Sequence, residues 1–398
     1  MTSSGPNPVA FWFNVTMKQS AASGMIAARL VRNGLRCRYL RLSGRPGRPQ
    51  AVSLEITHRC VCRCVMCNIW KIPESVPDLP LQEWVTLLSS DLLADLRELD
   101  ITGGEPFLRD DLVSLIHRIC ELKGAHLTRL RSVAITTNGV LSERVVGMVA
   151  QMLEPTRAAG LELVIVCALD AVDDTHDQIR CYDGAWQRVD TCIAGLIELR
   201  SSYPNLIIGV KTTVLPENVG KLEQIAEYAA ERGLFTIISP AIVTSGRYLN
   251  PDRAPRLALT ASDRASLAEF YESSAFRWSY HASALAGYLR TGRMKKPCSC
   301  GFNYFFVRST GEVHLCPLLD ETVGHVSAAP IATLFRSPQA RRSRSRIGRA
   351  PECARCTEPG LERYSLPYEG FAYLRTLLRL KPRSFLELHH HLGLDKYV

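Results

Sequence analysis

Apolar residues follow two different spacings between residue 52 and about residue 240. Short β-branched or apolar runs, typical of buried strands, alternate with longer stretches whose apolar residues recur at helical spacing. The predicted strands are Val52–Thr57, Glu98–Thr102, Ser132–Thr137, Leu161–Leu169, Leu206–Val214 and Phe235–Pro240. The predicted helices between them are Leu81–Leu96, Asp111–Lys123, Ser142–Leu153, Ala185–Leu199 and Asn218–Arg232. This alternation indicates an α/β fold, which we expect to form a (β/α)6 partial TIM barrel with its chemistry at the carboxyl ends of the strands.

The pattern changes before the first strand and again after Pro240. Gln19–Leu40 and Tyr364–Val398 have the pattern of basic amphipathic helices that flank the core. We expect five regions, which are a basic, partly helical N-terminal extension over 1–50, the barrel over 51–240, a helical linker over 241–297, a small cysteine-rich domain over 298–360 and a basic helical tail over 361–398.

Composition narrows the class of protein. A hydrophobic content of 46% and a charged content of 22% are typical of a globular protein, and no apolar run is long enough to span a membrane. The apolar patch Pro8–Val15 has no basic residue before it and no cleavage pattern after it, so we predict a cytoplasmic protein. Fourteen cysteines in a reducing compartment indicate metal or redox chemistry rather than disulfides.

The most specific motif is Cys60-Val-Cys-Arg-Cys64-Val-Met-Cys67, a CxxxCxxC that directly follows the first predicted strand. Three thiolates on one loop can bind three irons of a [4Fe–4S] cluster and leave the fourth iron open. The alternative is a zinc-stabilised binding protein. Zinc sites use four ligands in paired spacing, whereas this triplet has no adjacent second pair and Cys62 interrupts it, so the iron–sulfur interpretation is favoured.

The triplet resembles the cluster motif of the radical S-adenosylmethionine (SAM) superfamily, and Ile101-Thr-Gly-Gly-Glu-Pro106 resembles its GGEP motif. The resemblance implies that the open iron chelates SAM, whose reductive cleavage gives a 5′-deoxyadenosyl radical that abstracts hydrogen from a substrate. The family often has an aromatic residue where this chain has Met66. By resemblance, the residues expected to bind SAM or face its cavity are Gly103, Gly104, Glu105, Asn138, Asp170 and Lys211.

A second set of cysteines lies towards the C-terminus. Gly311-Glu-Val-His-Leu-Cys316 is a GxxxxC, and Cys353-Ala-Arg-Cys356 is a CxxC. With Cys298 they resemble the SPASM/twitch extension of radical SAM enzymes, in the shorter twitch form because no cysteine follows Cys356. The resemblance implies an auxiliary [4Fe–4S] cluster bound by four thiolates. Cys300 competes with Cys298 as the first ligand, and a structural zinc ribbon is the alternative.

A fully ligated auxiliary cluster favours a net oxidation, because it can accept the electron left on the substrate after hydrogen abstraction. The predicted protein is therefore a radical SAM oxidoreductase that acts on a small natural product or a peptide, with a flavodoxin- or ferredoxin-type reductase as electron donor. One alternative is an epimerase in which Cys181, at a position that is usually glycine in SPASM-type enzymes, returns a hydrogen atom. Another is a maturase of ribosomal peptides or proteins. The substrate and the oligomeric state stay open.

The net charge of +9 is concentrated in Arg29–Arg48, Arg336–Arg349 and Arg375–Arg383. The arginines of the middle segment have no interleaved aromatic residues, which argues against binding of nucleic acid. The basic helices at the two ends could contact an anionic membrane surface, but charged runs more often form a solvated face, and we favour that interpretation.

Overall fold

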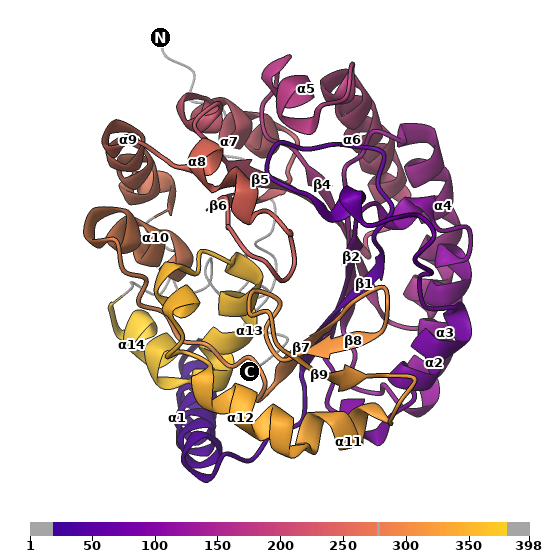
Figure 1. The fold of residues 1–398 in the computed structure, drawn as a ribbon, viewed down its shortest axis with the longest axis vertical. Helices are drawn as coiled ribbons and strands as arrows, with labels where there is room; N and C mark the ends of the chain where they lie inside the picture. The colour runs from indigo at the N-terminus through magenta and orange to yellow at the C-terminus, as the bar shows by residue number, and fades with distance from the viewer. Residues whose placement is uncertain (1–18, 277–278, 380–398) are drawn as a thin grey trace.

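The computed structural model describes residues 19–276 and 279–379 and is built around one nine-stranded sheet in the order β6-β5-β4-β3-β2-β1-β7-β8-β9 (Figure 1). Six parallel strands form the curved wall of a partial barrel, which confirms the predicted fold class. They are β1 (Ala51–Thr57), β2 (Glu98–Gly103), β3 (Ser132–Thr137), β4 (Glu162–Ala168), β5 (Leu206–Val214) and β6 (Phe235–Pro240).

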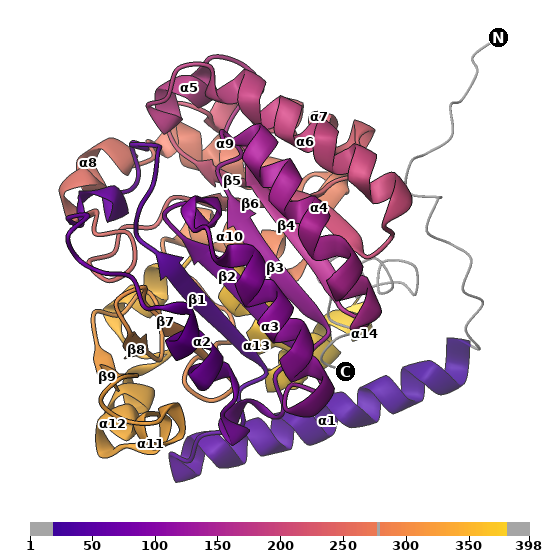
Figure 2. The ribbon, with the colours of Figure 1, turned by 90° about the vertical axis from the view of Figure 1, so that its right-hand side faces the viewer.

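The helices that connect these strands cover the outer face of the wall (Figure 2). They are α2 (Leu81–Leu88), α3 (Leu112–Ala125), α4 (Ser142–Ala158), α5 (Thr175–Arg180), α6 (Ala185–Ser202) and α7 (Leu222–Glu231). Alternate strand residues such as Leu54 and Ile56 are fully buried against them, in the main core. The intervening positions of β1, Ser53 and Glu55, lie on the inner face, where polar groups are available for chemistry.

Two predicted helices have different ends in the structure. The helix expected over Leu81–Leu96 ends at Leu88, and a separate 3-10 turn, Asp91–Leu93, follows it. Ser90 explains the break, because its hydroxyl accepts a hydrogen bond from the backbone N–H of Leu92 and so favours a new cap over helix continuation. The helix expected from Asn218 begins at Leu222, since the Asn218 side chain is used to bond neighbouring backbone groups.

The cysteine-rich segment continues the sheet of the barrel. Strand β7 (Tyr304–Val307) pairs in parallel with β1, and β8 (Glu312–His314) and β9 (Thr322–His325) follow as an antiparallel pair. Before them, after β6, come α8 (Ala254–Leu257), α9 (Ala261–Glu272) and α10 (Tyr280–Thr291), and after them α11 (Ile331–Arg336), α12 (Pro338–Arg346) and the 3-10 turn Pro351–Arg355. Both predicted cysteine sites are therefore attached to β1 or to strands that extend from it.

The first and last described helices lie together on one side of the barrel, where α1 (Gln19–Ser43) packs along α13 (Pro359–Glu369) and α14 (Phe371–Arg379) (Figure 2). Arg363 of α13 forms ion pairs with Glu98 and Asp100 of β2, and the rings of Tyr304 and Tyr364 stack with centroids 5.0 Å apart. Helix α13 is thereby fixed against the strands. Residues 1–18 of the predicted N-terminal extension, and the part of the predicted helix Tyr364–Val398 beyond residue 379, lie outside the described residues. Within the described residues no helix is long and apolar enough to cross a membrane.

Candidate metal centres

The loop after β1 brings the first three predicted cysteine ligands together. Its backbone is held across the barrel mouth, because the N–H of Arg63 donates to the carbonyl of Arg180 at 3.1 Å and that of Val65 donates to Ile179 at 2.9 Å. A turn from Cys64 to Cys67, with an N–H to O distance of 3.1 Å, folds the loop back on itself. The predicted triplet therefore lies on a loop that the opposite side of the barrel holds in place.

Cys62 lies between two predicted ligands and is almost fully buried. Its hydrogen bonds to Cys60 and Cys64, together with burial, raise the pKa of Cys62 far above its usual range. The same hydrogen bond, with the positive charge of Arg180, lowers the pKa of Cys64 to about 6. Because thiolate is the form that binds metal, this arrangement favours Cys64 as a ligand and keeps Cys62 protonated.

Arg180, which the sequence analysis did not single out as a site residue, connects the cysteine loop to β4. Its guanidinium forms an ion pair with Asp170 at 2.6 Å and lies 3.7 Å from the sulfur of Cys64. Asp170 also accepts the backbone N–H of Thr213 at 2.8 Å, and burial raises its pKa although Arg180 opposes this. Asp170, predicted to face the SAM cavity, is thus occupied by chain donors and fixes Arg180 in this structure.

Gly103 and Gly104 lie against the backbone of the segment that leads into the cysteine loop. A Cβ on Gly103 would stand 2.2 Å from the carbonyl oxygen of Thr57, and one on Gly104 would stand 2.2 Å from that of Arg59. The N–H of Gly104 donates to Thr57 at 2.8 Å, and the N–H of Glu105 donates to Arg59 at 2.8 Å. The two glycines are therefore required for close packing of the two loops.

Glu105 is fully buried and accepts three hydrogen bonds from the chain. The donors are the N–H of Phe107 at 3.1 Å, the hydroxyl of Thr137 at 2.9 Å and the N–H of Asn138 at 2.7 Å. Burial raises the pKa of Glu105 to about 7 despite these donors. A carboxylate offers about four acceptor positions, so the three donors of the chain leave one unused.

Asn138 directly follows β3, and Lys211 lies within β5, with β4 between the two strands. The amide nitrogen of Asn138 lies 3.8 Å from the sulfur of Cys60, and its oxygen accepts the N–H of Val140 at 3.0 Å. Lys211 is half-buried on β5, and its ammonium has no hydrogen-bond partner among the described residues. The structure thus places Asn138 beside the cysteine loop.

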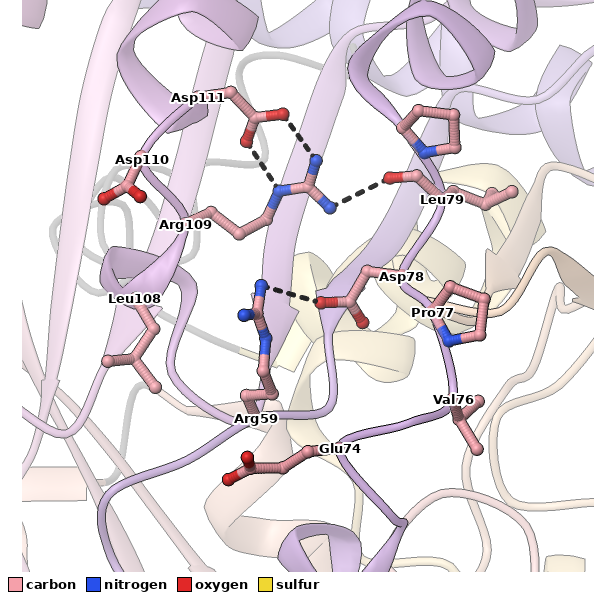
Figure 3. Close-up of a pocket in the computed structure, with 11 residues that line it drawn as sticks. Arg59, Glu74, Val76, Pro77, Asp78, Leu79, Leu108, Arg109, Asp110 and Asp111 are labelled. Carbon is pink, nitrogen blue, oxygen red and sulfur yellow. Dashed lines mark hydrogen bonds and ion pairs between the residues drawn. The ribbon is translucent and has the colours of Figure 1, made fainter.

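A pocket of about 420 Å³ lies beside the cysteine loop, between residues 74–80 and 108–111 (Figure 3). Arg109 points across it, donating to Asp111 on one side and to the carbonyl of Leu79 at 3.0 Å on the other. Arg59 lies 3.4 Å from the carboxylate of Asp78. These polar side chains bind one another, so the pocket walls support the cysteine loop.

The second set of predicted ligands converges from three separate segments. Cys298 precedes β7, Cys316 follows β8, and Cys353 and Cys356 lie on or next to the 3-10 turn after α12. Burial raises the pKa of Cys356 to about 12, and negative charge on Cys316 and Cys298 adds to this rise. The same two thiols act on Cys353. The thiols of Cys298 and Cys316 therefore influence both cysteines of the CxxC pair.

Cys300 affects Cys298 in the same way as Cys62 affects Cys64, as a buried neighbour that hydrogen-bonds to it. It is almost fully buried and hydrogen-bonds to both Cys298 and Cys316. The bond from Cys300 lowers the pKa of Cys298 to about 6, whereas burial raises that of Cys300 well above its usual range. The geometry is consistent with the predicted choice of Cys298 as the ligand.

The donor chemistry of both sets fits iron–sulfur clusters. In the described residues, no group of three or more Cys, His, Asp or Glu side chains surrounds a single point as the ligands of one metal ion would. A [4Fe–4S] cluster binds each thiolate to a different iron, so its thiols stand around a cube rather than around one ion. The residues of both predicted sets are cysteines, and thiolate is the usual protein ligand of such a cluster.

The chain after the last cysteine leads back to the barrel mouth. The hydroxyl of Thr357 donates to the carbonyl of Pro240 at 3.1 Å, at the end of β6. Glu358 is buried with its carboxylate 4.0 Å from Arg247, which in turn donates to the hydroxyl of Thr102 at 3.2 Å. Burial alone would raise the pKa of Glu358, but Lys211 and Arg247 hold it below its usual range. Sequence reasoning missed Arg247 and Glu358, because neither lies in a recognisable motif.

Cys181, the alternative hydrogen donor, ends α5 in the left-handed conformation with φ of 48°. Its side chain is exposed and its thiol lies 3.5 Å from the carbonyl of Gln178. The left-handed conformation explains why glycine is expected at this position. In this structure the thiol is bonded to its own helix end.

Residues 54–229 match the family model of the radical SAM superfamily, and residues 298–357 match the SPASM model, an iron–sulfur cluster-binding domain. The chain is similar to the AdoMet-dependent heme synthase of Methanosarcina barkeri, at 24% identity over 73% of this chain and 83% of that protein. It is also similar to the subtilosin biosynthesis protein AlbA of Bacillus subtilis, at 24% identity over 46% of this chain and 38% of that protein. The match with AlbA thus covers well under half of the relative.

Two solved structures have the same fold. Streptococcus suis SuiB bound to its precursor peptide SuiA superimposes with a TM-score of 0.55 at 13% identity, over 75% of this chain and 66% of that one. The protein anSMEcpe with bound AdoMet gives 0.56 at 16% identity, over 86% and 99%. At these identities the likeness shows the arrangement of the chain and no more.

Proposed function

The chain belongs to the radical SAM superfamily and carries a C-terminal SPASM domain, and from this premise we propose that it oxidises a peptide or a small natural product by two electrons. The cofactors are SAM, a catalytic [4Fe–4S] cluster at Cys60, Cys64 and Cys67, and an auxiliary [4Fe–4S] cluster. When bound, they supply a 5′-deoxyadenosyl radical and an acceptor for the second electron. The auxiliary ligands are Cys298, Cys316, Cys353 and Cys356.

The residues of the chain prepare the catalytic site. Arg180, fixed by Asp170, holds positive charge beside Cys64 and favours its thiolate. Glu105 joins the loop after β2 to Asn138 after β3, so that two strand ends beside the cysteine loop keep a fixed separation. Lys211 and Arg247 provide cations on the inner side, where an anionic group of the substrate can bind.

The observation that carries the proposal is the contact between the auxiliary region and the barrel mouth. Glu358, two residues after Cys356, lies 4.0 Å from Arg247, and Arg247 bonds Thr102, the residue before Gly103. A substrate held at the strand ends would therefore lie between the two cysteine sets. This proximity favours direct transfer of the substrate's second electron to the auxiliary site, with a proton released to solvent.

A peptide is the substrate class that the relatives favour. SuiB was solved with a precursor peptide, anSMEcpe was solved with a Cp18Cys peptide, and AlbA is named for biosynthesis of a bacteriocin. The heme synthase supports a small molecule instead. A one-electron reductant of the flavodoxin or ferredoxin class completes the reaction, because SAM cleavage consumes one electron.

The proposal is tested by iron, sulfide and SAM cleavage on anaerobically reconstituted protein. We expect about eight irons in the parent and about four in each of two variants, Cys60/Cys64/Cys67→Ala and Cys353/Cys356→Ala. With dithionite as reductant, the first variant should release no 5′-deoxyadenosine, whereas the second should still release it. Zinc without iron in the parent would contradict the radical assignment.

The alternative epimerase has one observation in its favour, which is the non-glycine residue at a left-handed position. Epimerisation leaves the mass of the substrate unchanged and introduces one deuterium in heavy water, because Cys181 exchanges its thiol proton with solvent. Oxidation instead lowers the mass by two hydrogens. Mass spectrometry of a turned-over peptide in both solvents separates the two functions, and Cys181→Ala should abolish only an epimerisation.

A further inference from the structure

Helix α1 has two apolar faces, and the fold buries only one of them. The buried face contains Leu30, Gly34, Cys37 and Leu40, which contact α13, α14 and the residues before β7. The fit is close, since a Cβ on Gly34 would stand 2.4 Å from the ring of Phe371. This face accounts for the position of α1 against the body of the protein.

The second face is a row of exposed apolar side chains, Val31, Leu35, Tyr39 and Leu42, which we call the α1 ridge. Their spacing of four, four and three residues puts them on one line, about 16 Å long at the rise of an α-helix. Leu42 is 90% exposed, Leu35 60% and Tyr39 59%. Most of the large hydrophobic side chains that the described part of the chain exposes belong to this ridge.

Arginines flank the ridge on both sides. Arg29, Arg32 and Arg36 are exposed on one flank and make no ion pair within residues 19–276 and 279–379. On the other flank, Arg38 stacks on the ring of Phe371 at 4.4 Å and Arg41 on that of Phe302 at 5.3 Å. The ridge therefore has a cationic border along its whole length.

The neighbouring helices extend this charge. Helix α1 contains five arginines, α12 four and α14 two, and none of the three helices contains an acidic residue. Contact between them is direct, because Arg341 of α12 approaches Gly44 at the end of α1 and α14 packs on α1. Leu378 of α14 adds another side chain that is 79% exposed.

We infer that the α1 ridge lies on the surface of an anionic lipid bilayer. Helix α1 forms one border of the molecule (Figure 2). A lipid interface adapts to a single apolar row with cations beside it, whereas a protein partner would have to offer a matching groove, and four side chains are narrow for a stable protein interface. Tyr39 has the amphipathic ring that suits the headgroup layer.

The inference changes the sequence-based interpretation of this helix as a solvated face. The sequence shows a basic amphipathic pattern, but not that a second apolar row stays exposed after the first has packed. The inferred membrane contact does not depend on the proposed reaction, because the α1 ridge lies away from both cysteine sets. The one contact between this surface and a cysteine set is that of Arg41 with the carbonyl of Cys298, within the described residues.

Flotation of the full-length protein with vesicles tests the inference. We expect binding to phosphatidylcholine vesicles that contain phosphatidylglycerol, little binding to phosphatidylcholine alone, and a loss at high salt. Leu35→Gln/Leu42→Gln should weaken binding about ten-fold or more, as should Arg29→Gln/Arg32→Gln/Arg36→Gln. Val243→Gln, which replaces an exposed apolar residue elsewhere, should have no effect.

Three outcomes would overturn the inference. The parent could fail to bind anionic vesicles while binding an acidic protein, which would assign the ridge to a protein partner. It could bind both kinds of vesicle equally, which would show adsorption without charge recognition. The Leu35→Gln/Leu42→Gln variant could also unfold at a clearly lower temperature than the parent, which would show that another part of the full chain covers the ridge.

Discussion

Cys60, Cys64 and Cys67 lie on one loop, whereas Cys298, Cys316, Cys353 and Cys356 come from three segments separated by a hairpin and two helices. The first set needs only a strand, a turn and an anchor across the barrel mouth. The second set needs β7 and β8 to pair and the turn after α12 to fold back. Assembly of the auxiliary site thus depends on long-range contacts that the catalytic loop does not require.

The two sets nevertheless share a local device. Each has a buried thiol that donates a hydrogen bond to a predicted ligand and lowers the pKa of that ligand to about 6, Cys62 for Cys64 and Cys300 for Cys298. Thiolates at neutral pH bind metal more readily than thiols. Similar local chemistry therefore prepares two sites whose scaffolds differ.

The largest expected effect is a loss of iron, which distinguishes the cluster ligand in each set from the neighbouring cysteine that only donates a hydrogen bond to it. Cys64→Ala and Cys298→Ala should each lose about four irons, because each removes a cluster ligand. Cys62→Ala and Cys300→Ala should keep about eight irons, since they remove only a donor. Iron and sulfide analysis after anaerobic reconstitution checks all four. Loss of iron from Cys300→Ala together with retention in Cys298→Ala would reverse the assignment at the auxiliary site.

The next effect concerns the arginine that supports each set. Arg180→Met leaves the buried carboxylate of Asp170 without its cation and should lower the free energy of unfolding by about 3–5 kcal/mol. Arg344 is also buried, but it donates only to the carbonyls of Gly301 and Phe335, so Arg344→Met should cost about 2 kcal/mol. Denaturant unfolding of the metal-free proteins measures both.

Iron content gives the control for these two variants. Arg180→Met should lose catalytic iron while the auxiliary site still loads, and Arg344→Met should do the reverse. Equal loss of both clusters in either variant would show that the two sites fold as one unit. The catalytic loop would then depend on the same long-range contacts as the auxiliary site.

Acid should affect the barrel side through His176. Burial, with the charge of Arg180, lowers the pKa of His176 to about 3, and its Nδ1 accepts the N–H of Asp170 at 3.0 Å. In the unfolded chain the imidazole of His176 is protonated below about pH 6.5, whereas in the folded protein it stays neutral down to about pH 3. The contribution of His176 to the free energy of unfolding should therefore fall by about 1.4 kcal/mol per pH unit as pH drops through this window.

His176→Asn isolates this effect, because the amide oxygen can accept the same N–H but does not titrate. In His176→Asn, unfolding between pH 4 and 6 should take up one proton fewer than it does in the parent. The slope of the unfolding free energy against pH, measured on metal-free protein, gives this difference. Glu105 has a raised pKa, so its contribution to the free energy of unfolding rises as pH drops from about 7 to 4.5. Because Glu105 is present in both proteins, this contribution cancels when the two slopes are compared. Identical slopes would mean that His176 is protonated in the folded state.

The smallest expected effect is a gain. Cys181→Gly should stabilise the protein by about 0.5–1 kcal/mol, because glycine adopts a φ of 48° without the strain that a side chain meets there. Thermal unfolding detects such a shift, and Cys181→Ala is the matched control that keeps the strain. If the parent forms an epimerised product, a more stable Cys181→Gly protein that cleaves SAM normally but no longer forms this product would assign the thiol to the reaction.

The barrel strands and the first cysteine loop can be predicted from the order of the residues, because both depend on nearest neighbours in the chain. Alternating apolar residues define each strand, and CxxxCxxC has its spacing whatever the rest of the chain does. The GGEP motif was visible in the same way. Its glycines, however, turned out to make room for the backbone of Thr57 and Arg59.

Contacts between residues far apart in the chain become visible once the chain has folded. The structure shows three of them. It placed β7 against β1, paired Asp170 with Arg180, and brought Glu358 to Arg247 at the barrel mouth. It also left the α1 ridge exposed after the opposite face of the same helix had packed. Helical spacing shows which residues share a face, but which face is buried depends on the partner that arrives from elsewhere in the chain.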